Sequence, residues 1–324
     1  MDNNTFSVVE GVVSDMGGTI EEFIPERNCF CINVLGKRVL LKRNISITRQ
    51  TFVSAQQTTC KDITHKLLTE NDLPVPMAQF FYANNYNKEQ EIKKLNSLKY
   101  PIILKPSMGF GSRGIFPDIK NVKSAIKVIE KNLTQCKSMI AQEMVFGKEY
   151  RVLVLGDEII AALQNIHPHI IGDGVSKVKE MIKEKQKTTE KKTKFDKKLK
   201  QVLESQGVSL KSVLPKGKII YFKGHACLAE GGETKDVTDI VHEKVKDICV
   251  KASKTVGKYL VGIDIICDDI SSDPIKGSFN ILEMNGKPDL YIHYEPDHGK
   301  TRNVLKKIIS FLATVSVLPL SQVD

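Results

Sequence analysis

The stretch KPSMGFGSRGIF, residues 105–116, constrains the fold of this chain more than any other segment. It spaces Gly109, Gly111 and Gly114 as G-x-G-x-x-G, a pattern that lets a backbone approach phosphate groups closely. The apolar run YPIILKP before it predicts a buried strand that ends near Lys105, and IFPDI after it reads as a second strand. The loop is therefore expected to connect two strands, although a lone motif of this kind is a weak signal.

The second strand excludes two common phosphate sites. A dinucleotide-binding Rossmann loop needs a helix that begins at the third glycine, but Pro117 lies in the segment after Gly114. A Walker A loop needs Lys-Ser or Lys-Thr after its last glycine, where this chain has Ile115 and Phe116. Two interpretations remain: a loop that folds over a triphosphate, with Lys105 as a point charge, or an exposed hairpin loop.

The rest of the chain predicts antiparallel strand pairs with helices between them. Turn signals at Leu35-Gly36-Lys37 and at Gly156-Asp157 each separate two apolar runs. The other expected elements are short strands over the first fifty residues, a helix over 61–71 with Ile63, Leu67 and Leu68 on its apolar side, a helix capped by Asn121, a strand in KGKIIYFKG, a helix over 242–257, the strands VGIDIICDD and GSFNILEMN, and a last helix from near Arg302. This order favours an α+β fold over a doubly wound parallel sheet.

Three oxygen-bearing side chains are predicted to converge. Asp264 lies among apolar residues, and a buried carboxylate is costly unless it is paired or binds a cation. Glu283 and Asn285 are two residues apart in NILEMN, so both point to the same face of a strand. If the two strands pair, the three oxygens would suit Mg²⁺ rather than zinc. The alternatives are a buried acid pair or a strand edge.

The net charge of +10 raises the question of a nucleic-acid partner. Residues 183–200 hold nine lysines against three acidic residues and supply +6 of that charge, so no broad nucleic-acid face is predicted. The composition predicts that this run is a solvated helix or a mobile loop. Seven cysteines without C-x-x-C spacing, no signal peptide and no membrane-length apolar run predict a cytoplasmic protein with reduced thiols.

Lys61, Lys105, QEMVFGKEYRVLVLGDE, Asp264 and EMN follow one another in an order that resembles the ATP-grasp ligases. The match is greatest to the ATP-grasp modules of cyanophycin synthetases and bifunctional glutathione synthetases, through NVLGKRVLLKRN, HPHIIGDGVSKVKEMI, AEGGETKDVTDIVH and PDLYIHYEPDHGK. The resemblance spans roughly residues 30–312 and implies an ATP-grasp fold, in which two α+β lobes clasp ATP. The expected parts are a short β-rich segment over 1–50, an N-lobe with the glycine loop over 51–138, and a C-lobe over 139–324 with the metal site and the Lys-rich insertion.

The resemblance also implies a role for each candidate site residue. It implies phosphate contacts from Lys61 and Lys105, and a lid formed by Gly109, Gly111 and Gly114. It places the adenine edge at Gln142 and Glu143, with Val145 near its backbone contact, and the ribose at Glu149. It assigns magnesium to Asp264, Glu283 and Asn285, and cations near the transferred phosphate or the substrate to Arg151 and Lys223. ATP and magnesium are the expected cofactors, with two ions expected and Mn²⁺ able to substitute. His169 and His293 match family positions, whereas His65 and His242 are expected to be solvated on helices.

The implied activity is ligation of a carboxylate to an amine through an acyl phosphate, with ADP and phosphate released. The expected partners are amino-acid or peptide substrates and, in a homo-oligomer, further copies of the chain. Cys227, Gln164 and Asn165 replace residues that are usual in these relatives, and the Lys-rich run replaces an arginine- and glycine-containing stretch, so the substrates are not identified. The alternatives are a stand-alone glutathione-synthetase-like enzyme, a non-catalytic nucleotide-binding module, and a nucleic-acid binder acting through residues 183–200.

Overall fold

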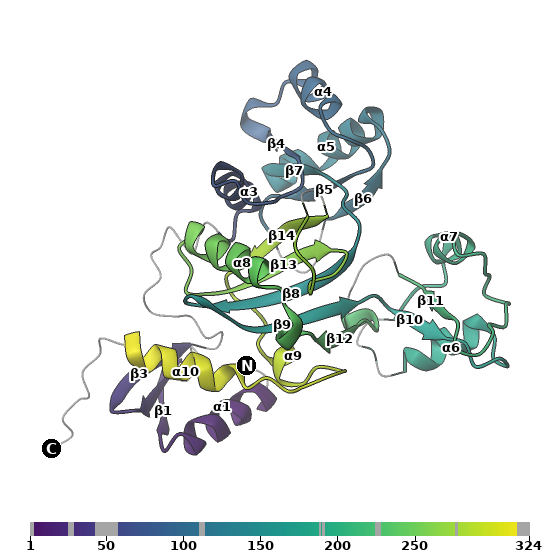
Figure 1. Cartoon of the computed structure of the whole chain (residues 1–324). Helices are drawn as coiled ribbons and strands as arrows, with labels where there is room; N and C mark the ends of the chain where they lie inside the picture. The colour runs from purple at the N-terminus through teal and green to yellow at the C-terminus, as the bar shows by residue number, and fades with distance from the viewer. Residues whose placement is uncertain are drawn as a thin grey trace.

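The computed structural model describes residues 3–24, 29–42, 58–109, 114–187, 189, 192–223, 228–275 and 278–315. Figure 1 shows a sheet with helices beside it at the top, a larger sheet in the middle, a small lobe on the right and the N-terminal segment below. All pairs of named strands among the described residues are antiparallel. The predicted α+β class is confirmed.

The upper sheet carries the strands on either side of the glycine loop. Its strand order is β4 (Ala78–Tyr82), β7 (Ser138–Glu143), β5 (Ile102–Pro106) and β6 (Phe116–Ile119), and α4 (Lys88–Asn96) and α5 (Val122–Cys136) pack against it. The predicted cap is confirmed, because the side chain of Asn121 accepts a hydrogen bond from the backbone N–H of Ser124 at 2.9 Å. The loop therefore joins two paired strands, as its sequence predicts.

The central sheet has five strands. Their order is β12 (Glu233–Asp236), β9 (Glu158–Ile166), β8 (Lys148–Leu155), β13 (Leu260–Cys267) and β14 (Phe279–Asn285). Gly156, with φ of +59°, makes the predicted hairpin turn between β8 and β9. One face of this sheet packs against α8 (Glu243–Thr255) and the end of α3 (Lys61–Glu70) in one apolar core.

The opposite face of the central sheet is divided along β8. Leu153 and Leu155 pack into an apolar core with α1 (Asn3–Asp15), α10 (Val304–Val315) and the sheet β1 (Thr19–Ile24), β2 (Cys29–Val34) and β3 (Lys37–Lys42). Because side chains alternate along a strand, Arg151 and Glu149 lie on that same face, beyond the apolar half. The face is therefore apolar at one end and polar at the other.

The prediction of short strands over the first fifty residues was wrong for α1. Val9, Val12 and Val13 are buried, a spacing that gives a helix one apolar stripe. Valine is β-branched and common in strands, so composition outweighed spacing in the prediction. The predicted strands on either side of the Leu35-Gly36 turn are confirmed as β2 and β3.

The small lobe contains most of the Lys-rich run. It is built from β10 (His169–Ile171), α6 (Val178–Lys185), α7 (Lys197–Glu204) and β11 (Ile219–Tyr221) around an apolar core of its own. The run is neither one solvated helix nor one loop, because α6 ends and α7 begins within it. Gln186 and Thr193, between these helices, are buried.

The remaining elements are short, and α3 differs from its prediction in one respect. They are η2 (Ala83–Asn85), η3 (Leu228–Glu230), η4 (Thr238–Ile240) and α9 (Tyr291–Tyr294). The helix predicted over 61–71 is confirmed as α3, but its buried residues are Thr64 and Leu68, and Ile63 is exposed. In the part of the chain described, no helix combines the length and hydropathy needed to cross a membrane. The free cysteines there are Cys31, Cys60, Cys136, Cys249 and Cys267.

Candidate functional site

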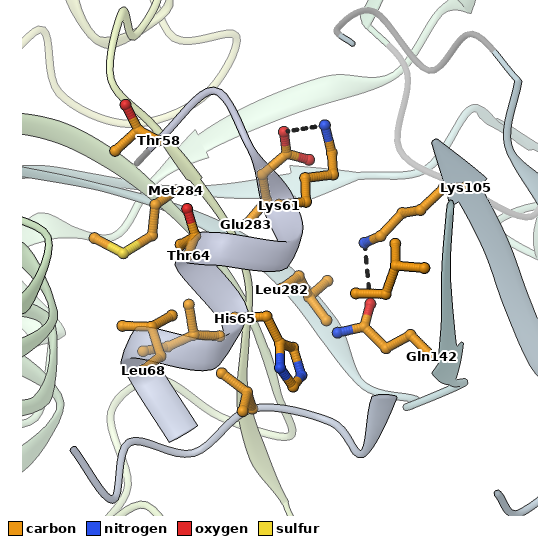
Figure 2. Close-up of a pocket in the computed structure, with 13 residues that line it drawn as sticks. Thr58, Lys61, Thr64, His65, Leu68, Lys105, Gln142, Leu282, Glu283 and Met284 are labelled. Atoms are coloured by element: carbon orange, nitrogen blue, oxygen red, sulfur yellow. Dashed lines mark hydrogen bonds and ion pairs between the residues drawn. The ribbon is translucent and has the colours of Figure 1, made fainter. Parts of the chain in front are cut away.

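A pocket lies where α3, the upper sheet and β14 meet. Figure 2 shows Lys61 and His65 of α3, Lys105 of β5, Gln142 of β7 and Glu283 of β14 around it. Its free volume is about 20 Å³, little more than one water molecule needs. Side chains from α3, the upper sheet and β14 therefore converge here and fill most of the space between these elements.

Lys105 and Gln142 form the part of the pocket that belongs to the upper sheet. The ammonium of Lys105 donates to Oε1 of Gln142 at 3.0 Å, and both residues are buried. Burial lowers the pKa of Lys105, and the nearby Lys61 lowers it further, while Glu283 and Asp264 oppose the shift. A buried ammonium with one neutral partner is a favourable place for an anion.

Lys61 connects the base of the glycine loop to β14. Its ammonium donates to the carbonyl oxygen of Gly109 at 2.8 Å and lies 3.2 Å from Oε1 of Glu283. The N-terminal turn of α3 is held to the loop as well, because the backbone N–H of Lys61 donates to the carbonyl of Ser107 at 2.8 Å. One lysine therefore contacts both the predicted lid and a predicted metal ligand.

The strand pairing brings the three predicted metal ligands together. In the β13–β14 ladder Asp264 lies opposite Glu283, and Gly262 lies opposite Asn285. Nδ2 of Asn285 donates to Oδ2 of Asp264 at 2.9 Å, which leaves the amide oxygen of Asn285 available. The predicted convergence of these side chains is confirmed.

Arg151 is paired with Asp264 across the β8–β13 ladder. Its Nε donates to Oδ1 of Asp264, and its Nη2 donates to Oδ2 at 3.0 Å, in the bidentate geometry typical of an arginine–carboxylate pair. Burial raises the pKa of Asp264, and the guanidinium opposes this shift. Gly262 leaves room for the arginine, because a Cβ there would lie 3.2 Å from Cδ of Arg151 and 3.0 Å from Cβ of Pro288.

The donor set fits a hard divalent cation. The carboxylate of Glu283 and the amide oxygen of Asn285 are oxygen donors beside Asp264, whose Oδ1 keeps one lone pair after pairing with Arg151. No group of three or more His, Cys, Asp or Glu side chains suited to a metal occurs in the described part of the chain. Two carboxylates and an amide suit Mg²⁺, which keeps several waters and is commonly completed by substrate phosphates.

The described ends of the glycine loop need glycine. Gly109 and Gly114 have φ of +133° and +72°, which residues with a Cβ rarely adopt. A Cβ on Gly114 would also lie 3.0 Å from Cγ of Pro106. Gly111, the third predicted lid glycine, lies outside the described residues, as does Cys227.

The residues predicted to contact adenine and ribose are Gln142, Glu143, Val145 and Glu149. Gln142 and Glu143 follow each other on β7, so their side chains point to opposite faces; Oε1 of Glu143 accepts from the backbone N–H of Lys99 at 2.7 Å. An adenine contact by Glu143 would therefore use its backbone, as was predicted for the partly buried Val145. Glu149 lies two residues before Arg151 on the same face of β8, and its Oε1 is 3.0 Å from Nε2 of His167.

Lys223 lies in the small lobe, just after β11. Its ammonium is 3.0 Å from Oε2 of Glu230. It lines a second hollow, formed by residues of α7 and the Lys-rich run. The described contacts therefore pair Lys223 with the small lobe rather than with the pocket around Lys105.

The pocket contains residues that sequence reasoning missed, among them His65 and Leu282. His65 was expected to be solvated, which was wrong: its Nε2 lies 2.8 Å from the carbonyl oxygen of Pro76, and burial lowers its pKa. The spacing Lys61, His65, Leu68 would have placed it on the buried side of α3. Leu282 lines the pocket because β14 has a bulge at this residue. Ile265 and Asp264 of β13 lie opposite Ile281 and Glu283, so Leu282 has no opposite residue on β13. The simple alternation of side chains along a strand does not predict such a bulge.

His293 of α9 is fully buried close to the polar half of the central sheet. Neither ring nitrogen has a hydrogen-bond partner among the described residues. Burial lowers the pKa of His293 to about 3, and the positive charge of Arg151 acts in the same direction. The ring is therefore neutral at physiological pH.

Comparison with known proteins gives one family. A model of the ATP-grasp domain matches residues 60–289. The glutathione biosynthesis bifunctional protein GshAB of Clostridium perfringens is 29% identical over 283 residues, which cover 84% of this chain and 36% of that protein. A cyanophycin synthetase of Nostoc sp. is 30% identical over 289 residues, which cover 86% of this chain and 32% of that protein. The chain spans about a third of the length of these curated relatives.

Solved structures show the same fold. A bifunctional glutathione synthetase from Pasteurella multocida has a TM-score of 0.68 at 22% identity, over 94% of this chain and 44% of that one. The D-alanine–D-alanine ligase from Bacillus anthracis, complexed with ATP, has a TM-score of 0.50 at 12% identity, over 82% of this chain and 68% of that one.

Proposed function

Because this chain belongs to the ATP-grasp family, we propose that it is an ATP-dependent carboxylate–amine ligase that releases ADP and phosphate. The carrying observation is the convergence of Lys105 of the upper sheet, Lys61 of α3 and Glu283 of β14 around one pocket, next to Asp264 and Asn285. Positive charge for phosphates and oxygen ligands for a cation are the two requirements of phosphoryl transfer.

The proposed roles of the nucleotide-binding residues follow from where each lies. Lys105 and Lys61 exchange their partners Gln142 and Glu283 for phosphate oxygens, and the glycine loop from 109 to 114 covers them. The segment 142–145 takes the adenine edge, through side-chain or backbone groups. Glu149, on the polar half of the central sheet, takes the ribose.

Asp264, Glu283 and Asn285 would hold magnesium. Two ions are proposed, and Mn²⁺ would replace them because it accepts the same oxygen donors. The metal would supply neutralisation of negative charge on the phosphates. Arg151 keeps Asp264 oriented toward that position, which preorganises the ligand before the metal arrives.

The reaction proposed has two displacements. A carboxylate oxygen of the acid attacks the γ-phosphorus, and ADP leaves, so that an acyl phosphate forms. The amine then attacks the acyl carbon, loses a proton and expels phosphate, which leaves an amide. The closed glycine loop excludes water from the acyl phosphate, and Arg151 supplies positive charge near the developing oxyanion. Lys223 would add a second positive charge there only if it left Glu230 and the small lobe approached the pocket.

The proposed substrates are amino acids or peptides, because the curated relatives are named for glutathione biosynthesis and cyanophycin synthesis. A stand-alone glutathione-synthetase-like specificity is the second candidate within this class, because the structure with a TM-score of 0.68 is a glutathione synthetase. We further propose that the protein acts in the cytoplasm, on small-molecule substrates.

The test is ADP release with magnesium and ATP, screened over amino acids and dipeptides supplied both as acids and as amines. With an active acid, ¹⁸O placed in its carboxylate is expected in the released phosphate, and hydroxylamine in place of the amine is expected to give a hydroxamate. Release of AMP and pyrophosphate, or phosphate without the label, would rule out this reaction.

A further inference from the structure

We propose that His167 is a positioning residue for the nucleotide, which holds the carboxylate of Glu149 in the orientation that accepts the ribose hydroxyls. Nε2 of His167 lies 3.0 Å from Oε1 of Glu149, and each side chain is 28% exposed. This inference rests on the proposed function, in which Glu149 takes the ribose. It adds the residue that makes Glu149 selective for a ribose over a sugar without hydroxyls.

The contact between His167 and Glu149 follows from the register of β8 and β9. Glu149 lies opposite Asn165 in this ladder, and His167 follows Asn165 by two residues, just past the end of β9. Residues two apart share a face of a strand, so His167 is the diagonal neighbour of Glu149 on the polar half of the central sheet. An imidazole is long enough to bridge such a diagonal pair.

The carboxylate of Glu149 keeps room for further donors. An ionised carboxylate only accepts hydrogen bonds, so Nε2 of His167 carries the hydrogen and donates it to Oε1. No other hydrogen bond to this carboxylate occurs among the described residues. Oε2 and the second lone pair of Oε1 are therefore available, and the two neighbouring hydroxyls of a ribose are a matching pair of donors.

The imidazole of His167 is held from the side of the small lobe. Its ring lies edge-on to that of Tyr221 on β11, with centroids 6.1 Å apart and planes at 78°. Its backbone carbonyl oxygen is 3.1 Å from Nδ1 of His169. The carbonyl of the next residue, Pro168, accepts from the backbone N–H of Phe222 at 3.0 Å. The fold therefore places the donor in advance, which lowers the entropy cost of the contact.

The pair of His167 and Glu149 is expected to affect nucleotide binding more than folding. Water screens a partly exposed ion pair, so its contribution to stability is small. A bound ribose covers the carboxylate and removes water from it, which strengthens its hydrogen bonds to the hydroxyls and to His167. Without His167 the carboxylate can rotate, and its orientation must be fixed when the nucleotide binds.

The experiment measures, by calorimetry with magnesium, the affinity of a non-hydrolysable ATP analogue and of its 2′,3′-dideoxy counterpart. The test variants are His167→Leu, which removes the donor, and His167→Gln, which keeps an N–H donor. Glu149→Ala shows how much of the preference for the ribose form depends on the carboxylate. The matched control is His298→Leu, because His298 also contacts a carboxylate, Oε2 of Glu233 at 2.8 Å, but one without a proposed role in nucleotide binding.

We expect His167→Leu to lower the affinity for the ribose form about fivefold, the typical net contribution of one hydrogen bond, and to leave the dideoxy form within about twofold. His167→Gln should recover most of this loss, Glu149→Ala should abolish the preference for the ribose form, and the control should change neither affinity. Equal loss of both ligands in His167→Leu, an equal loss in the control, or a ribose preference that survives His167→Leu or Glu149→Ala would overturn the proposal.

ADP release, measured on the same proteins, separates this inference from the proposed function. A ligase that releases ADP, but whose ribose preference does not depend on His167, contradicts only the positioning role. A ribose preference that depends on His167, without ADP release for any acid and amine, contradicts only the proposed ligase.

Discussion

At the scale of single residues, substitutions of Asp264 and Glu283 distinguish an effect on stability from an effect on metal binding. Asp264→Asn breaks the pair with the partly buried guanidinium of Arg151 and is expected to lower the free energy of unfolding by about 1–3 kcal/mol. Glu283→Gln keeps that pair and is expected to change stability less. Both variants should lose most of the magnesium dependence of ATP-analogue affinity, which calorimetry with and without metal measures. Unchanged magnesium dependence in both would remove these residues from the metal site.

Lys105 is a residue at which binding and stability are expected to move in opposite directions. Lys105→Met keeps the aliphatic stem and removes an ammonium whose burial is unfavourable, so the free energy of unfolding should stay the same or rise. ADP release should fall about a hundredfold or more, because preorganised charge at the phosphates is lost. Lys93→Met, at an exposed position of α4, is the control. A near wild-type rate for Lys105→Met would exclude Lys105 as a phosphate contact.

His293 links stability to pH. Its pKa is about 3 in the folded chain against 6.5 ordinarily, so between these values the unfolded chain binds a proton that the folded chain does not. Stability must therefore fall as pH falls from 6.5 toward 3, by at most about 1.4 kcal/mol per pH unit from this residue. His293→Leu should flatten that slope, which urea unfolding at pH 7, 6 and 5 measures. Parallel slopes in the two proteins would show that another group is responsible.

At the scale of elements, β13 can lie beside β8 with Arg151 across it only because residue 262 is a glycine. Gly262→Ala adds a Cβ at 3.2 Å from Cδ of Arg151, in a space already limited by Pro288. We expect displacement of the arginine, a stability loss of about 1–3 kcal/mol and weaker magnesium-dependent nucleotide binding. Gly11→Ala, where nothing lies within 4 Å of the added carbon, is the control in α1. Unchanged metal dependence in Gly262→Ala would show that Arg151 does not position Asp264.

At the scale of the whole molecule, the N-terminal segment shares its core with the central sheet. Ile32 of β2 is fully buried in the same cluster as Leu153 of β8 and Ile308 of α10. Ile32→Ala is expected to cost about 2–5 kcal/mol and to lower the stability of the whole chain in one transition. Leu35→Ala, 61% exposed in the neighbouring turn, should cost little. A separate early transition in Ile32→Ala would show instead that residues 1–50 unfold as a unit of their own.

Much of the fold follows from local pattern. Glycine turns between apolar runs, the Asn121 cap and the strand–loop–strand order around the glycine loop are local features, and each is confirmed. Some local predictions were wrong: valines favoured strands over the helix α1, Ile63 was placed on the buried side of α3, and His65 was expected to be solvated. In each case packing against distant segments decided which residues are buried.

The sequence by itself determined which residues could carry the chemistry, because only certain side chains supply cations for phosphates or oxygens for magnesium, and their spacing on strands limits which can share a face. The sequence could not determine which of these side chains are in contact in the folded chain. Strand register decides the pair of Arg151 with Asp264 and the bulge at Leu282. The packing of α3 against β14 decides the contact of Lys61 with Glu283. The hollow that Lys223 lines depends on how α7 packs against the segments that precede it and follow β11. Distances between residues far apart in the chain are set by the packed core as a whole, so only the tertiary structure decides them.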